Sequence, residues 1–163
     1  MWTWDLLLAR REGLVLGHME WEGLLLTAEL GSPEGGWHCG YIYAPPEMHS
    51  VLRSLPSEGW PGTGDLTASG SCMGMPYVGW DYGHAWNRES GTRTPSPDAV
   101  FLHALPVAGV IRDRHHLALA AREALAHPAR VLGLIASMAP YPRDSVVAAW
   151  ETRHAATERD AAR

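Results

Sequence analysis

Asp81 and His84 lie three residues apart, with Tyr82 and Gly83 between them. A carboxylate that accepts a hydrogen bond from an imidazole orients the ring and stabilises its cation, an arrangement used in general acid–base catalysis. The same pair can support a metal-bound histidine from outside the coordination sphere, or can simply hold a turn. The spacing therefore indicates a catalytic, a metal-supporting or a structural pair, and the sequence leaves these three roles open.

The tract around this pair, residues 66–87, is rich in glycine, hydroxyl and aromatic side chains. Trp and Tyr offer flat apolar faces together with a polar edge, which suits the lining of a ligand pocket. Hydroxyls beside glycine-exposed backbone N–H groups can cradle an anion, although a bulged strand has the same composition. We expect a pocket for a small, nucleotide-like ligand here, with these lining residues: Tyr41, Ser69, Ser71, Trp80, Tyr82, Trp86 and Asn87.

Two other chemistries have weaker support. Cys72 lies in a G-x-C-x-G pattern, but a nucleophile in such a pattern needs a strand that turns into a helix. Gly74 and Pro76 follow, so a small buried thiol is the favoured interpretation. None of the nine histidines has the H-E-x-x-H or H-x-H spacing of a metal site, so we expect neither a metal nor another cofactor.

Composition excludes several classes of function. All the basic residues are arginine, so neither a Schiff-base lysine nor a P-loop lysine is available. Residues 1–98 carry a negative excess, which disfavours broad nucleic-acid binding. The apolar runs are far shorter than the ~20 residues of a membrane span, and the N-terminus has no basic region before an apolar one. We therefore expect a cytoplasmic protein without membrane contact.

Hydrophobic periodicity predicts an α+β fold in one domain, 1–163, with a β-rich part (1–90) and a helical part (98–155) packed on it. The β-rich part is expected to form an antiparallel meander or sheet. Its predicted strands are residues 2–9, 14–18, 24–30 and 37–44, and residues 66–85 broken into two strands by Pro76. Helices are expected at residues 47–55, at about 114–126 with an end at His127-Pro128, and twice more beyond.

Three segments between Trp37 and Asn87 carry a resemblance: Gly40-Tyr41-Ile42-Tyr43-Ala44-Pro45, Leu66-Thr67-Ala68-Ser69-Gly70 and Gly79-Trp80-Asp81-Tyr82-Gly83-His84-Ala85. In this order the segments resemble a family of small proteins of bacteriophages and prophages, with the pattern G-Y-V-x-[VI]-P, then L-T-[YF]-S, then G-F-D-x-[AG]-H-A. The resemblance implies that Asp81 and His84 belong to the family pattern. That family has no assigned activity, so the resemblance implies none here.

Two hypotheses of different classes follow. The first is a small binding protein whose pocket takes a nucleotide-like ligand, with interference in host defence signalling as the use that the phage resemblance suggests. The second is a hydrolase or transferase in which His84 is the acid–base group and Asp81 orients it. The sequence decides neither between them nor whether the chain forms a homo-oligomer.

Overall fold

The computed structural model describes residues 4–31, 34, 36–83, 93–127 and 129 of the 163-residue chain. By its internal contacts the chain divides into two compact units, Met1–Leu117 and Ala118–Arg163. In the second unit the described residues are the end of one helix and the two positions 127 and 129. The helices that the sequence predicts beyond residue 127 lie outside the described part, and the single domain stays a prediction.

The first unit is built on a five-stranded sheet in the order β1-β2-β3-β5-β4, and each neighbouring pair is antiparallel. The α+β fold predicted from the sequence is confirmed. The sheet places β4 at one edge and β5 inside, between β3 and β4. The strands are β1 (Val15–Trp21), β2 (Leu24–Leu30), β3 (His38–Tyr43), β4 (Ala68–Cys72) and β5 (Met75–Asp81).

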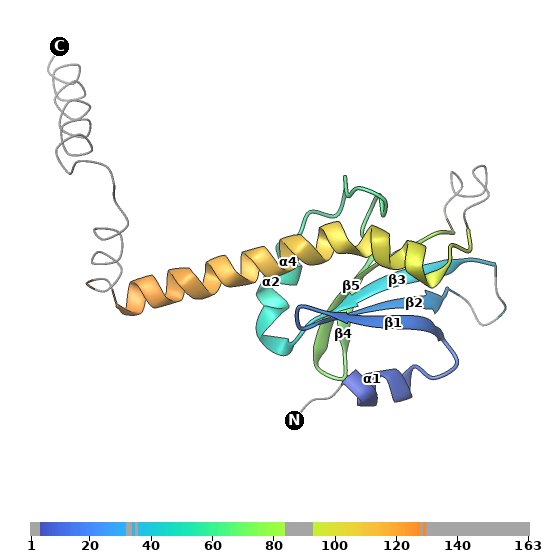
Figure 1. The fold of residues 1–163 in the computed structure, drawn as a ribbon, viewed down its shortest axis with the longest axis horizontal. Coiled ribbons are helices and arrows are strands. Elements are labelled where there is room, and N and C mark those ends of the chain that lie inside the picture. Colours follow the sequence, from blue (N-terminus) through green and yellow to red (C-terminus); the bar gives the residue numbers. More distant parts are fainter. Residues whose placement is uncertain (1–3, 32–33, 35, 84–92, 128, 130–163) are drawn as a thin grey trace, which may run out of the picture. The chain divides into compact units, whose positions relative to one another are not determined.

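One face of the sheet, here called the α4 face, is covered by the first part of the long helix α4 (Pro97–Ala126), as Figure 1 shows. The buried residues of this helix lie between Val100 and Ile111. Because side chains alternate along a strand, every second residue points into this layer. The short helices η1 (Pro46–Met48) and α2 (His49–Arg53) pack into the same core through Met48, Val51 and Leu52. The other buried members include Leu24, Leu26, Ile42, Val78 and Trp80 from the sheet and Val100, Ala104, Val107, Ala108 and Ile111 from α4.

The opposite face, here called the α1 face, meets a seven-residue helix, α1 (Trp4–Arg10), where the sequence predicts a strand. That prediction is wrong. A short apolar run does not distinguish a strand from a buried helix by periodicity, and Leu, Ala and Arg are all strong helix formers. Leu7 is fully buried against Leu25, Tyr43 and Met75, whereas Leu6 is 53% exposed, so only one stripe of the run enters the core.

The break between β4 and β5 falls at Met73-Gly74, and Pro76 lies inside β5, contrary to the sequence prediction. Met73 and Gly74 both have positive φ, 53° and 81°, as in the two-residue turns that match the twist of a hairpin. Pro76 lies opposite Ala44, one residue beyond the last β3–β5 pair, Tyr43 with Tyr77, and its carbonyl accepts a hydrogen bond from the N–H of Ala44 at 2.9 Å. Proline, which has no N–H to donate, thus occupies the position where the pairing with β3 ends.

Helix α4 begins at Pro97, whereas the sequence predicts a start near residue 114. Ser96 precedes the helix, and its Oγ accepts a hydrogen bond from the N–H of Ala99 at 3.3 Å. Proline suits the first turn of a helix, and Pro106 is accommodated further along. The end at Ala126, directly before His127-Pro128, confirms the predicted stop. Of the helices described, none is long and apolar enough to cross a membrane.

Candidate functional site

A cavity of about 280 Å³ opens between α2 and the β4–β5 edge of the sheet, on the α4 face. Both apolar and polar residues contribute to its lining. The apolar lining comes from Leu52, Leu55, Pro56, Leu66, Ala68, Pro76 and Val78, and the rest from His49, Arg53, Ser57, Ser69, Gly70 and Tyr77.

Helix α2 forms one wall because the chain turns sharply after β3. Pro45-Pro46 ends the strand and starts the η1 turn, and α2 follows directly. Val51 and Leu52 are buried in the core, which fixes the rotation of this short helix. His49 and Arg53 are four positions apart, so they lie one above the other on the side that faces the cavity.

Strand β4 forms the other wall. Ser69 pairs with Val78 in the sheet register, and their side chains project from the same face, toward the cavity. A Cβ on Gly70 would lie 2.8 Å from the hydroxyl oxygen of Tyr77. Glycine at position 70 therefore leaves room for the Tyr77 side chain next to β4.

Among the described residues, the cavity lining contains one permanently charged group, the Arg53 guanidinium, and no carboxylate. Neighbouring Ser54 is anchored to α4, since Nη1 of Arg114 donates to its carbonyl oxygen at 2.8 Å and to its hydroxyl at 3.1 Å. This contact holds the end of α2 and brings a second arginine to it. The described lining of the cavity is therefore mixed in polarity, with Arg53 as its charged group.

The structure places the residues predicted to bind a ligand in three different surroundings. Ser69 lines the cavity, and Ser71, two residues along the same face, does not. Trp80 and Tyr82 are buried in the core under α4, with 1% and 3% of their surfaces exposed. Tyr41 lies on the α1 face. Trp86 and Asn87 lie outside the described residues, as does His84.

Asp81, the predicted orienting carboxylate, is held at the end of β5. Its Oδ1 accepts a hydrogen bond from the N–H of Gly83 at 2.9 Å, and its Oδ2 accepts one from Thr67 Oγ1 at 3.1 Å. These contacts tie the chain after β5 to the segment before β4. The pairing of Asp81 with His84 and its catalytic use stay predictions.

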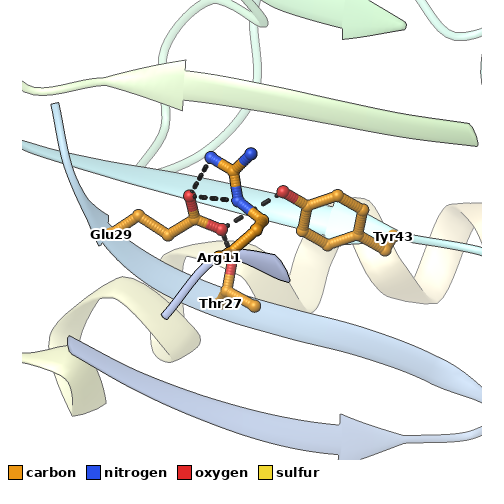
Figure 2. A network of polar contacts seen from close by, with 4 residues as sticks. All are labelled: Arg11, Thr27, Glu29 and Tyr43. Atoms are coloured by element: carbon orange, nitrogen blue, oxygen red, sulfur yellow. Dashed lines mark hydrogen bonds and ion pairs between the residues drawn. The ribbon is translucent and has the colours of Figure 1, made fainter. Parts of the chain in front are cut away.

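A buried carboxylate that the sequence analysis missed lies on the α1 face. Figure 2 shows Glu29, fully buried in β2, with donors around both oxygens. Its Oε1 accepts hydrogen bonds from Thr27 Oγ1 at 2.7 Å and from the Tyr43 hydroxyl at 3.2 Å. Arg11 donates to Oε2 through both Nε, at 2.8 Å, and Nη2. Because every acceptor direction is occupied, this network is a structural connection rather than an open site.

Three tyrosine rings extend this network across the same face. The ring centroids of Tyr41, Tyr43 and Tyr77 lie 5.5 to 6.1 Å apart, and the Arg11 guanidinium carbon lies 5.6 Å from the centroid of Tyr41. Burial, helped by the negative charge of Glu29, raises the pKa of Tyr43 well above its usual range. Burial likewise raises the pKa of Tyr41. Both phenols are therefore neutral donors at physiological pH.

Cys39 is buried in β3, where it pairs with Asp81 of β5 in the sheet register. Burial, with the nearby Asp81 carboxylate, raises the pKa of the Cys39 thiol to about 11. A nucleophilic cysteine requires a lowered pKa, so Cys39 has the opposite surroundings. Cys72, at the end of β4, is followed by the two-residue turn and not by a helix. The strand-to-helix geometry of a G-x-C-x-G nucleophile is thus missing at this position.

A second polar pair that the sequence analysis missed joins the sheet to α4. The hydroxyl of Tyr82 lies 2.8 Å from Nδ1 of His103, within hydrogen-bonding distance. Burial raises the pKa of the Tyr82 phenol. Both rings lie in the packed layer between β5 and α4, so the polar edge of Tyr82 is directed at the helix.

Sequence signals exist for part of what was missed. Glu29 is the one acidic residue in an otherwise apolar strand, Leu24–Leu30, and a charge in such a place needs a partner. His49 and Arg53 have the spacing of one helical turn. No sequence pattern connects Arg11 with Glu29, because their contact depends on where α1 lies. Within the described residues, no group of three or more His, Cys, Asp or Glu side chains could hold a metal ion.

Comparison of the chain with protein-family models, with curated proteins and with solved structures gives no match.

Proposed function

We propose that this protein binds a small organic ligand, and that the binding site is the cavity between α2 and the β4–β5 edge. The observation that carries the proposal is a partly open cavity whose described lining combines apolar side chains with several polar groups. Ligand sites are typically concave and mostly apolar, with a small number of polar groups that orient the ligand. The cavity volume of about 280 Å³ is close to the lower end of the usual range.

The proposal keeps the small ligand expected from the sequence but moves its site. Among the predicted ligand residues that the structure describes, Ser69 alone lines the cavity. Trp80 and Tyr82 support the site from the core, because Trp80 lies beneath the same sheet face as Val78. Nucleotide-like compounds are the first class to test, and a role in blocking host defence signalling is the use that the resemblance to phage-encoded proteins suggests.

A ligand screen by thermal shift, with two matched tryptophan variants, tests the proposal. Ser69→Trp should fill the cavity from the exposed edge strand and abolish the shift produced by the binding compounds. Ser71→Trp places the same side chain on the same strand and face, outside the cavity, and should keep the shift. If the two variants bind equally well, or if no compound in a broad panel binds the natural chain, the proposal is wrong.

A further inference from the structure

We propose that the ligand of this cavity is a compact organic anion, with an apolar body on the sheet and a single carboxylate or phosphate monoester held by Arg53. This inference rests on the proposed function, because it names the ligand class for the same cavity. It goes beyond that proposal in the charge, the number of charged groups and the size of the ligand.

The Arg53 side chain has hydrogen-bond donors that no described residue uses. In the part of the chain that the structure describes, three other arginines are engaged, by Glu29, Asp113 and Ser54. Arg53 has neither an ion pair nor a side-chain hydrogen bond within the described residues. An unpaired guanidinium at the rim of a cavity, in a chain with a net charge of −5, leaves five donors for a ligand.

Arg53 and the groups around it suit an anionic ligand. The planar guanidinium fork matches the geometry of a carboxylate or phosphate and binds either in a bidentate manner. His49, one helical turn away, and the hydroxyls of Ser57 and Ser69 add further donors around the rim. The lining residues that the structure describes include no carboxylate that would attract a cation, so their electrostatics favour an anion over an amine.

The apolar side chains and the volume of the cavity indicate what the uncharged part of the ligand is. The lining includes apolar side chains such as Leu52 and Val78, and a bare inorganic anion would leave their surface in contact with water. The cavity volume of about 280 Å³ is close to the lower end of the usual range for small-molecule sites, which favours a compact ligand such as one ring with one anionic substituent.

Binding of defined probes, followed by amide chemical shifts in solution, tests the inference. Phenyl phosphate and benzoate are expected to bind saturably and to shift the amides of residues 49–57 and 66–78. Their affinity should exceed that of the neutral benzyl alcohol about tenfold, the typical effect of one charge-assisted bidentate contact. Benzylamine should bind more weakly than benzyl alcohol, because it carries a positive charge. Inorganic phosphate should bind more weakly than phenyl phosphate, because it lacks the apolar body. Adenosine monophosphate should bind no better than phenyl phosphate.

Two glutamine variants separate this inference from the proposed function. Arg53→Gln should lower the affinity for phenyl phosphate to that of the neutral probe and leave benzyl alcohol binding unchanged. Arg10→Gln removes the same charge from the exposed side of α1, outside the cavity lining, and should change neither affinity by more than about twofold. Equal binding of anionic and neutral probes, unaffected by Arg53→Gln, would overturn the inference but keep the cavity as a site. If no probe shifts the cavity amides, the proposed function fails together with it.

Discussion

The guanidinium of Arg11 donates two hydrogen bonds to Oε2 of Glu29, at a position where the glutamate side chain has no exposed surface. Arg11 follows α1 directly, and Glu29 lies near the end of β2. The pair therefore connects the chain after α1 with the inside of the sheet, next to the place where Leu7 is buried. Taking two charges out of water is unfavourable unless each is fully hydrogen-bonded, and the hydroxyls of Thr27 and Tyr43 complete this requirement for Glu29.

Removal of Arg11 should therefore destabilise the protein more than its partly exposed position indicates. Arg11→Met leaves the buried carboxylate without a counter-charge, and we expect a loss of about 3 kcal/mol in the free energy of unfolding. Urea denaturation measures this value, with Arg10→Met as a control for the loss of a surface charge on the same helix. In the double variant Arg11→Met/Glu29→Gln the loss should be smaller than the sum of the single losses, because the unpaired charge is gone. Additive losses would show that the two side chains do not interact.

Stability should fall in alkaline solution, and the direction follows from the raised pKa values. Cys39 has a pKa of about 11 in the folded protein, against about 8.5 in an unfolded chain, and the pKa values of Tyr41, Tyr43 and Tyr82 are raised as well. Between these values the unfolded chain releases protons that the folded protein keeps, so raising the pH favours unfolding. The contribution of Cys39 is complete below about pH 8.5 and is lost as the pH rises through 11, whereas the contribution of the three tyrosines is complete below about pH 10 and declines above it.

A denaturation series between pH 7 and pH 11 checks this expectation. Cys39→Ala should make the decline between about pH 8.5 and 10 shallower, because the tyrosines begin to titrate only near pH 10 in the unfolded chain. The buried Cys39 thiol should also react with iodoacetamide more slowly than Cys72 at pH 8. A stability that is constant up to pH 11 would contradict the burial of these four groups.

The sequence predicts the sheet well and the candidate site poorly, for physical reasons. Strand Leu24–Leu30 and the end of α4 at Ala126 follow from local signals, a bounded apolar run and a His-Pro step. The cavity follows from the approach of α2 to β4, which depends on how Val51 and Leu52 pack and has no local signature. The density of aromatic residues in 66–87 indicated a ligand site, whereas Trp80 and Tyr82 are buried under α4.

Gly40 and Trp80 form a contact in which the glycine is required. A Cβ at position 40 would lie 2.2 Å from Cζ2 of Trp80, in the middle of a fully packed layer. Gly40→Ala should therefore cost about 1–3 kcal/mol of stability through overpacking, and a smaller side chain at position 80 should recover part of this loss. Gly109→Ala is the matched control, because α4 has nothing within 4 Å of the added methyl group and alanine favours a helix by up to ~1 kcal/mol. Thermal unfolding should show opposite shifts for the two variants, and equal shifts would contradict the packing of Trp80 on β3.

Measurements of stability and activity together decide whether Asp81 and His84 form a catalytic pair or a structural one. Asp81 accepts hydrogen bonds from Thr67 and from the backbone of Gly83, so Asp81→Ala should cost about 1–2 kcal/mol whether or not the pair is catalytic. Thr67→Val removes one of these bonds without touching the proposed acid–base pair, and it serves as the control for a purely structural effect. If the pair is catalytic, Asp81→Asn and His84→Gln should each abolish turnover of a phosphodiester or ester substrate. The double variant should then be no worse than either single variant, because the two residues act as a unit. The control Thr67→Val should retain activity. If the Asp81 and His84 variants lower the melting temperature in parallel and ligand binding at the cavity persists, the pair holds the chain after β5 and has no catalytic role.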